Sequence, residues 1–346
     1  MKTRYLDART PDGLKASVAA ACEILRAGEI AALPTETVYG LCADARDAKA
    51  VGKIFEAKGR PQDNPLIVHI ATPEALDEIA CNIPDAARRL AEKYWPGPLT
   101  MIFEKKSVIP AVTSGGLDTV AVRMPSHPVI REVILQSGIP IAAPSANRSG
   151  SPSPTTAEHV TADFDGVIPL IVDSGCSQFG VESTVISFAV QPPRLLRPGS
   201  VTAEQLREEL GEIAIDDAIL HPLAEGQRVS SPGMKYRHYA PQAQIVLLKG
   251  DAAAFSAYTR RHVGDGVYAL CFDEDETVLP AVRYGGQADP AQQAARLFAA
   301  LRELDERGAK LVYGHFPQSD GVGLAVCNRI LRAAGFRVIE IESERK

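Results

Sequence analysis

Short apolar runs alternate along this chain with segments in which apolar residues recur at helical spacing. In the first 200 residues, the runs that predict β-strands are 30–33, 66–70, 99–103, 119–124, 139–143, 170–173 and 183–187. The segments that predict helices there are 13–28, 48–58, 73–79 and 85–94. This alternation is typical of proteins in which helices pack against the faces of one sheet. We therefore expect an α/β sheet domain over residues 1–210, which a helix at 202–210 closes.

The same pattern restarts after Pro241. A turn-rich segment at 226–233 predicts a domain boundary. The predicted elements beyond it are strands 245–248, 267–272, 311–313 and 337–341 and helices 252–261, 290–306 and 323–334. We predict a linker over 211–241 and a smaller doubly wound, Rossmann-like α/β domain over 242–346.

The composition excludes several classes of protein. With 45% hydrophobic and 23% charged residues the chain is typical of soluble globular proteins, and its net charge of −6 argues against nonspecific binding to nucleic acid. The six cysteines lie far apart, without the paired spacing of a zinc site or a dithiol motif. No run reaches the roughly 18 apolar residues of a membrane span, and the first residues lack the apolar core of a secretory signal. We expect a cytoplasmic protein with reduced thiols and no membrane association.

Polar and basic side chains occur where predicted strands give way to loops. They lie in 34–40 (Pro-Thr-Glu-Thr-Val-Tyr-Gly), 58–60 (Lys-Gly-Arg) and 144–147 (Pro-Ser-Ala-Asn). Open α/β sheets present ligand-binding groups at such positions. The first hypothesis is a site for a polyanion together with a small polar molecule.

Two polar side chains lie inside predicted strands. Alternation places His69 on the less apolar face of its strand, and Arg123 on the face opposite Val120, Val122 and Met124. A histidine in a strand is often only a hydrogen-bonded core residue. A buried arginine needs an anionic partner. That partner is either a ligand or an internal carboxylate, for which Glu36 and Asp173 are the candidates.

The other polar segments contain groups that suit phosphate. Gly59 allows the chain to turn so that Lys58 and Arg60 face one target, although Lys-x-Arg triplets usually lie on solvated surfaces. Ser145 and Asn147 project to one side, and the hydroxyl-rich segment 149–155 follows them. Its alternative interpretation is an ordinary connection in which Thr155 or Thr156 caps the next helix. Arg197 ends a further apolar run, as Arg123 does.

Metal-ligand clusters, Walker loops, nucleophile elbows and Gly-x-Gly-x-x-Gly turns after a strand are absent from the sequence.

Taken in order, these segments resemble the threonylcarbamoyl-AMP synthase family in its long, two-domain form. The resemblance runs through 34–41, 58–60, 64–66, His69, 95–100, 122–125, 144–147, 182–185, 197–199, 231–241, 323–325 and 328–329. It implies a YrdC-like twisted open sheet domain followed by a smaller doubly wound domain. Each motif alone is weak, but the ordered set is highly specific.

The family resemblance implies that L-threonine, bicarbonate or CO₂, and ATP with Mg²⁺ give threonylcarbamoyl-AMP and pyrophosphate, as the first step of threonylcarbamoyladenosine modification of tRNA. The implied threonine-binding residues are Thr37, His69, Arg123, Ser183 and the main chain of Ala143. The implied ATP-binding residues are Lys58, Arg60, Asn64, Thr119, Ser145, Asn147, Ser153, Arg197 and Tyr236. Of these, Lys58, Arg60 and Arg197 are the implied catalytic cations, and the metal is carried by the ATP phosphates. The resemblance also implies double-stranded RNA binding and contact with tRNA or with the threonylcarbamoyl transferase complex.

Two further interpretations concern the linker and the function. Cations and aromatic rings at 235–239 suit a lid that closes over a nucleotide, whereas a passive spacer is the alternative. Carbamoyl-adenylate chemistry would need an acylphosphatase-like segment and zinc-finger cysteine pairs, which the sequence lacks. A noncatalytic RNA-binding or ribosome-maturation module is the alternative from another class of function, and the acidic charge argues against it.

Overall fold

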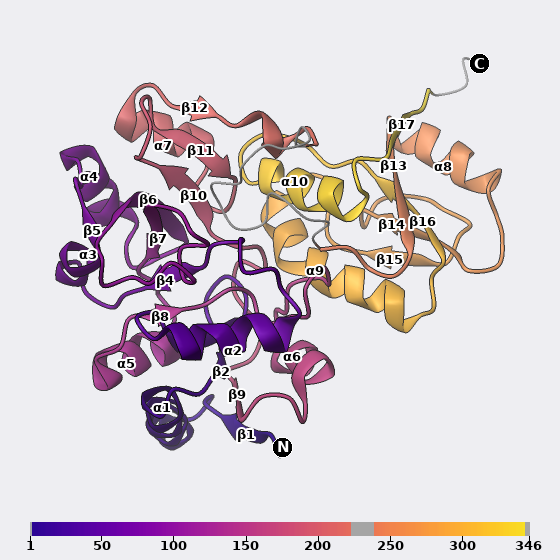
Figure 1. The fold of residues 1–346 in the computed structure, drawn as a ribbon. Helices are drawn as coiled ribbons and strands as arrows, with labels where there is room; N and C mark the ends of the chain where they lie inside the picture. Colours follow the sequence, from indigo (N-terminus) through magenta and orange to yellow (C-terminus); the bar gives the residue numbers. More distant parts are fainter. Residues whose placement is uncertain (1, 223–238, 343–346) are drawn as a thin grey trace. The chain divides into compact units, whose positions relative to one another are not determined.

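The structure is a computed structural model that describes residues 2–222 and 239–342. They form two compact units, which are described separately (Figure 1). The first contains residues 2–149 and 153–219, and the second contains 150–152, 220–222 and 239–342. Most of the expected linker, including Tyr236 and His238, lies outside the described residues, so the boundaries 1–210, 211–241 and 242–346 stay predictions.

The first unit is built on a twelve-stranded twisted sheet with the order β1-β9-β2-β3-β8-β4-β7-β6-β10-β11-β12, in which β5 pairs with β6. Its strands are β1 (Arg4–Asp7), β2 (Ala31–Leu33), β3 (Gly40–Asp44), β4 (Ile67–His69), β5 (Ala80–Cys81), β6 (Leu99–Lys105), β7 (Thr119–Arg123), β8 (Ile141–Ala142), β9 (Leu170–Asp173), β10 (Thr184–Ser187), β11 (Arg194–Arg197) and β12 (Ala214–Ile215). Parallel and antiparallel pairs are mixed: β4 and β7 run parallel, whereas β6 and β7 run antiparallel. The expected open sheet is confirmed.

The helices of this unit are α1 (Pro11–Arg26), α2 (Ala48–Lys58), α3 (Glu74–Ile79), α4 (Asp85–Tyr94), α5 (Pro128–Ser137), α6 (Ala157–Phe164) and α7 (Ala203–Leu210), with a 3₁₀ turn η1 (Asp217–Ile219). Thr10 caps α1 through its side chain, and the buried residues Val18 and Leu25 on one face of the helix join the core. Ile130 and Val133 of α5 belong to the same core cluster. Burial of this apolar surface stabilises both helices against the sheet.

The second unit is a five-stranded, wholly parallel sheet with the order β15-β14-β16-β13-β17. Its elements are β13 (Gln244–Lys249), α8 (Ala252–Arg260), β14 (Val267–Cys271), β15 (Ala281–Arg283), α9 (Pro290–Glu306), β16 (Leu311–His315), α10 (Gly323–Ala333) and β17 (Val338–Glu340). Parallel strands need crossover connections, which α8, α9 and α10 provide; β14 and β15 are instead joined by residues 272–280, which contain no helix. The expected doubly wound domain is confirmed, with the additional strand β15.

None of the described helices combines the length and the apolar character that crossing a membrane requires.

Candidate functional site

Strand register places the polar residues of the first unit in one row. His69 of β4 is paired with Arg123 of β7, and Arg123 with Thr100 of β6. Thr100 is paired with Val185 of β10, and Val185 with Arg197 of β11. The five strands are neighbours in the sheet (Figure 1). The row therefore brings together residues that are up to 128 positions apart in the sequence, from His69 to Arg197 (197 − 69 = 128).

Arg123 is buried and has a fixed set of partners. Its Nη1 donates to Thr37 Oγ1 at 2.9 Å, and its Nε donates to the Gly97 carbonyl at 3.2 Å. Its Nη2 lies 2.7 Å from Glu36 Oε1, with both side chains no more than 4% exposed. Of the two carboxylates suggested by the sequence, Glu36 is the one that pairs with Arg123, while Asp173 forms an ion pair with Arg9.

The segment that carries Thr37 is held by its own hydroxyl groups. Thr35 Oγ1 accepts hydrogen bonds from the amides of Thr37 and Val38, each at 3.2 Å, in an ST-turn arrangement. The next residues pair with the loop after β8, because the amide of Leu41 donates to the Pro144 carbonyl at 2.9 Å. These bonds place the 34–40 and 144–147 segments side by side.

His69 is buried beside this ion pair. Burial and the positive charge of Arg123 lower the pKa of His69 to about 3, so its ring is neutral at pH 7. Its Nδ1 has no hydrogen-bond partner within the described residues. A neutral imidazole with an open nitrogen can accept or donate one hydrogen bond to a ligand. Ala143 lies next to the same strand, since its amide donates to the Ile67 carbonyl at 3.0 Å.

Ser183, which directly precedes β10, contacts two members of the row, Thr100 and Arg197. The Ser183 and Thr100 hydroxyls are 2.8 Å apart, and Arg197 donates from Nη2 to the Ser183 hydroxyl at 3.1 Å. The Arg197 Nε also donates to the Ser183 carbonyl at 3.0 Å. Thr100 was not singled out from the sequence. Its only sequence signal is the 95–100 segment of the family resemblance.

Lys58 and the Ser-x-Asn segment form a second cluster. Gly59 ends α2 in a left-handed conformation (φ 61°), as expected of a glycine that lets the chain turn. The buried Lys58 ammonium donates to the Ser145 and Asn147 carbonyls, and the Ser145 hydroxyl lies 2.5 Å from Asn147 Oδ1. In this state Lys58 holds the main chain of the segment.

Arg60 and Asn64 lie in the following loop. Arg60 Nη2 donates weakly to the carbonyls of Asn64 and Pro65 at 3.4 and 3.3 Å. Asn64 is 1% exposed, yet neither its side-chain oxygen nor its side-chain nitrogen has a hydrogen-bond partner in the described part of the chain. Burying a side-chain amide without hydrogen bonds costs free energy, unless a bound ligand supplies the missing partners.

The remaining expected residues are less closely joined to the row. Thr119 is half-buried at the start of β7, four residues before Arg123. Ser153 is fully buried, and its hydroxyl lies 2.5 Å from Glu182 Oε1. Thr156, not Thr155, caps the next helix. Tyr236 lies outside the described residues.

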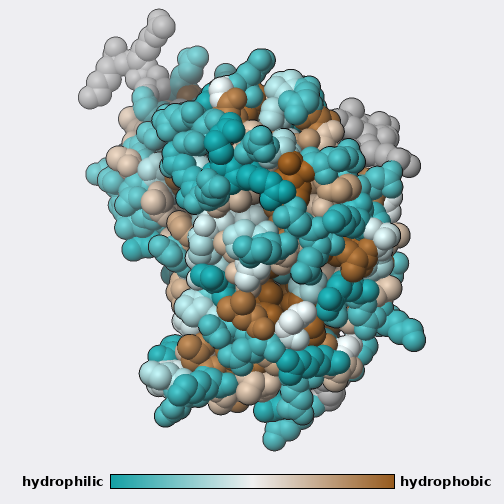
Figure 2. Space-filling model, turned by 90° about the vertical axis from the view of Figure 1, so that its left-hand side faces the viewer, coloured by the Kyte–Doolittle hydropathy of each residue, from teal (hydrophilic) through white to brown (hydrophobic). Residues whose placement is uncertain are grey.

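Two other features are poorer candidates for a nucleotide site. A hollow on the first unit, between α3 and α5, is lined mainly by apolar residues such as Ile70, Ile79, Ile134 and Leu135. Figure 2 shows apolar side chains gathered on the face that carries these helices in Figure 1. Such a lining offers no cations to a polyphosphate.

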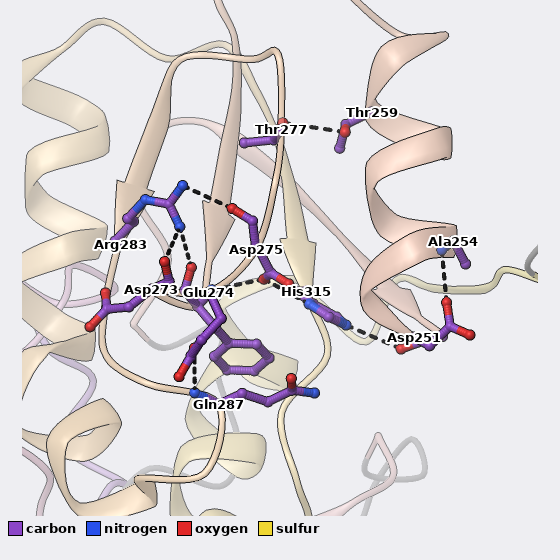
Figure 3. A network of polar contacts seen from close by, with 12 residues as sticks. Asp251, Ala254, Thr259, Asp273, Glu274, Asp275, Thr277, Arg283, Gln287 and His315 are labelled. Atoms are coloured by element: carbon purple, nitrogen blue, oxygen red, sulfur yellow. Dashed lines mark hydrogen bonds and ion pairs between the residues drawn. The ribbon is translucent and has the colours of Figure 1, made fainter.

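The other is a polar network at the carboxyl ends of the strands in the second unit (Figure 3). His315 Nδ1 lies 2.8 Å from Asp275 Oδ2, with both side chains 1% exposed, and His315 Nε2 contacts the Gly250 carbonyl at 3.1 Å. Burial alone would lower the pKa of His315, but its hydrogen bond with Asp275 and the charge of that residue raise it. Arg283 donates to the carbonyls of Asp273 and Asp275, each at 2.9 Å. These groups satisfy one another, so the network stabilises the sheet edge.

The described residues contain no group of three or more His, Cys, Asp or Glu side chains placed to hold a metal ion. Of the two buried carboxylates near the row, Glu36 forms an ion pair with Arg123 through Oε1, and Glu182 Oε1 lies beside the Ser153 hydroxyl. The site offers mainly cations, hydroxyls and amides, which suit the oxygens of a polyphosphate and of an amino acid.

The chain is similar to known proteins along most of its length. The model of the Sua5, YciO and YrdC family, described as "Telomere recombination", matches residues 23–199, and the model "Threonylcarbamoyl-AMP synthase, C-terminal domain" matches 201–335. The threonylcarbamoyl-AMP synthase of Pyrococcus abyssi is 46% identical, over 93% of this chain and 95% of that protein. That of Bacillus subtilis is 44% identical, over 98% of this chain and 100% of that protein.

Solved structures extend the similarity to the fold. The crystal structure of P. abyssi Sua5 complexed with L-threonine has a TM-score of 0.92 at 42% identity, and covers 98% of this chain and 100% of that one. Escherichia coli YciO matches with a TM-score of 0.50 at 21% identity, over 57% of this chain and 96% of its own, which shows the fold alone. Both family models and full-length relatives agree with the motifs noted in the sequence, and the chain belongs to the threonylcarbamoyl-AMP synthase family in its two-domain form.

Proposed function

We propose that the first unit is a nucleotidyltransferase that converts L-threonine, bicarbonate or CO₂, and ATP into threonylcarbamoyl-AMP and pyrophosphate. The observation that carries this proposal is the row from His69 to Arg197, in which the Ser183 hydroxyl is within hydrogen-bond distance of both Arg197 and Thr100. An enzyme that joins an amino acid to a nucleotide needs the two sites in contact. In this row the proposed amino-acid site and the proposed nucleotide site would be in contact.

The amino acid would occupy the part of the row around Arg123. Its carboxylate would bind the guanidinium, and Thr37, His69, Ser183 and the main chain of Ala143 would complete the pocket. Support comes from the burial of these groups and from the open Nδ1 of the neutral His69. The named relative from P. abyssi was crystallised with L-threonine, which is consistent with this choice of amino acid.

The nucleotide would bind on the side of Arg197, Arg60 and Asn64. Lys58 would hold the Ser145–Asn147 segment and contribute positive charge, while Thr119 and Ser153 would supply hydroxyls. The buried amide of Asn64, which lacks partners among the described residues, is the best structural support for a missing ligand there.

The chemistry matches this set of residues. The amine of threonine must lose its proton to take up CO₂ or bicarbonate, and an oxygen of the resulting carbamate then attacks the α-phosphate of ATP. Negative charge builds on the phosphoryl oxygens and on the departing pyrophosphate. Fixed cations and donors stabilise that charge without a protein nucleophile.

Magnesium would enter with the nucleotide. The described residues contain no group of carboxylates placed to hold the ion, so the triphosphate oxygens would be its ligands. When bound, the metal would neutralise part of the phosphate charge. Arg60 and Arg197 would position the same phosphates.

The proposal also covers the use of the product and the role of the linker. Threonylcarbamoyl-AMP would serve the threonylcarbamoyladenosine modification of tRNA in the cytoplasm, with tRNA or a threonylcarbamoyl transferase complex as the recipient. The linker around Tyr236 would shield the labile intermediate from water.

Mass spectrometry of a reaction containing threonine, bicarbonate, ATP and Mg²⁺ tests the proposal. The expected product is an adenylate that carries the mass of threonine plus CO₂. Omission of bicarbonate should abolish it, and serine in place of threonine sets the specificity. If no adenylate forms while the protein binds RNA tightly at physiological salt, the RNA-binding alternative replaces this one.

A further inference from the structure

Glu36 has a buried oxygen that the fold leaves open. Its side chain is 3% exposed. Oε1 is used twice, by Arg123 Nη2 at 2.7 Å and by the amide of Ser126 at 3.0 Å. Oε2 is also buried, but no group in the described ranges, 2–222 and 239–342, donates a hydrogen bond to it. A buried carboxylate oxygen without a donor is costly in an apolar setting.

The carboxylate is nevertheless charged. Burial acts to raise the pKa of Glu36, but the adjacent Arg123 charge and the hydrogen bonds from Arg123, from the Ser126 amide and from the amide of Glu36 itself outweigh it and hold the pKa below its usual range. The other titratable groups near it are His69 of β4 and His127 at the start of α5. Burial lowers the pKa of both histidines, so both are neutral at pH 7 and leave Oε2 without a cation of its own.

The charge count favours a positively charged ligand group beside Oε2. Glu36 and Arg123 together are neutral. If only a carboxylate docked on Arg123, the buried cluster would hold one uncompensated negative charge, which is unfavourable. In an α-amino acid a single carbon separates the carboxylate from the ammonium group. A ligand with its carboxylate at Arg123 can therefore place its nitrogen near the neighbouring Glu36.

We propose that Glu36 Oε2 binds the amino group of the substrate, so that the Glu36–Arg123 pair recognises both charges of an amino acid. The inference builds on the proposed function, because it assumes that the carboxylate of threonine occupies Arg123. It assigns to Glu36 a binding role beyond that of holding Arg123.

The test compares two ligands by calorimetry on the full chain. The ligands are L-threonine and 3-hydroxybutanoate, which keeps the carboxylate, hydroxyl and methyl groups but lacks the amine. The wild type is expected to bind threonine at least about 10-fold more tightly than 3-hydroxybutanoate. Glu36→Gln should weaken threonine binding by about 10- to 100-fold, which equals roughly 1.4 to 2.8 kcal/mol. By the same charge count, this variant should bind 3-hydroxybutanoate at least as tightly as the wild type does, because the ligand carboxylate is then balanced by Arg123 alone.

A matched control separates charge from position. Asp173→Asn removes one carboxylate charge from the same unit, where Asp173 pairs with the exposed Arg9, and should leave threonine affinity unchanged. Equal losses for both ligands in Glu36→Gln would show that Glu36 acts only through Arg123 and would overturn the inference. Should the variant fail to fold, equal binding of the two ligands by the wild type would also overturn it. A wild type that does not bind threonine at all would instead refute the proposed function.

Discussion

Arg197 donates two hydrogen bonds to Ser183, from Nε to the carbonyl at 3.0 Å and from Nη2 to the hydroxyl at 3.1 Å. The hydroxyl is also 2.8 Å from that of Thr100, which is paired in register with Arg123. A side chain proposed to bind ATP is thus bonded to one proposed to bind threonine. Binding of one substrate should therefore influence the other.

Arg197→Lys keeps the positive charge but cannot donate in the same fork. We expect kcat/KM for pyrophosphate release to fall by about 100-fold or more, as when one preorganised donor is removed. Steady-state kinetics with each substrate varied in turn would measure the effect on both. With Ser183→Ala added, the double variant should lose less than the sum of the two single losses, because the residues act as a unit. Additive losses would contradict the coupling.

Lys58→Met tests whether the ammonium holds the Ser145–Asn147 segment. The substitution removes the donor for two carbonyls, and the free energy of unfolding should fall by roughly 2 to 4 kcal/mol. We expect adenylate formation to be severely impaired in this variant, and also in Arg60→Ala, because each loses a cation that we assign to ATP binding. Trp95 is the only tryptophan and lies buried in the first unit, so its fluorescence during urea unfolding reports on that unit.

Lys49 offers a matched control for that substitution, since it is exposed on the same helix. Lys49→Met should change the free energy of unfolding by no more than about 0.5 kcal/mol. If both lysine variants were equally stable and equally active, Lys58 would have neither a structural nor a catalytic role.

Much of this arrangement is encoded in local patterns. Helices α2, α4 and α9 have the bounds that periodicity predicts, because each has one clear apolar face and clear end signals. The 34–40 and 144–147 segments were expected near a site because they follow apolar runs. The structure places them beside each other through the bond between Leu41 and Pro144.

Other features depend on strand register and on main-chain groups, which side-chain patterns do not specify. Strand β3 was missed because it directly follows the polar motif and lacks period-two alternation. The sequence left Glu36 and Asp173 open as partners of Arg123, because the choice depends on how the chain folds between the strands. The acceptors of Lys58 are carbonyl oxygens, which every residue has, so its partners could not be read from residue types.

Gly199→Ala probes the close packing behind Arg197. A Cβ at this position would lie 2.4 Å from the Thr184 amide nitrogen and 2.7 Å from its Oγ1, so the backbone has to shift. We expect a loss of about 1 to 3 kcal/mol in the free energy of unfolding and lower activity, because Arg197 and Ser183 flank the contact. Trp95 fluorescence and pyrophosphate release measure the two effects.

Gly52 is a matched control, because a side chain added at this position has room. It lies inside α2, and a Cβ there would meet nothing within 4 Å. Gly52→Ala should raise the free energy of unfolding by about 0.5 to 1 kcal/mol, because alanine loses less backbone entropy in a helix. A similar loss in both variants would mean that the tight contact at Gly199 is not the cause.

His69 should make the first unit less stable as the pH falls below 6.5. The pKa of His69 is about 3 in the folded chain against its ordinary value of 6.5. Between these values the unfolded chain binds a proton that the folded chain does not, so the free energy of unfolding rises with pH and levels off above about 7. The maximum slope is about 1.4 kcal/mol per pH unit and falls to half of that at pH 6.5, which gives a difference of roughly 1.6 kcal/mol between pH 5 and 6.5.

Urea unfolding followed by Trp95 fluorescence from pH 5 to 8 measures this dependence. His69→Gln removes the titrating ring and should flatten the curve below pH 6.5 relative to the wild type. His127, whose pKa is also lowered by burial, acts in the same direction in both proteins and cancels in the comparison. Glu36 acts only at lower pH, because its pKa lies below the usual carboxyl value. Parallel curves for the two proteins would show that His69 is not held neutral in the folded chain, and its proposed role as an uncharged partner of threonine would fail with it.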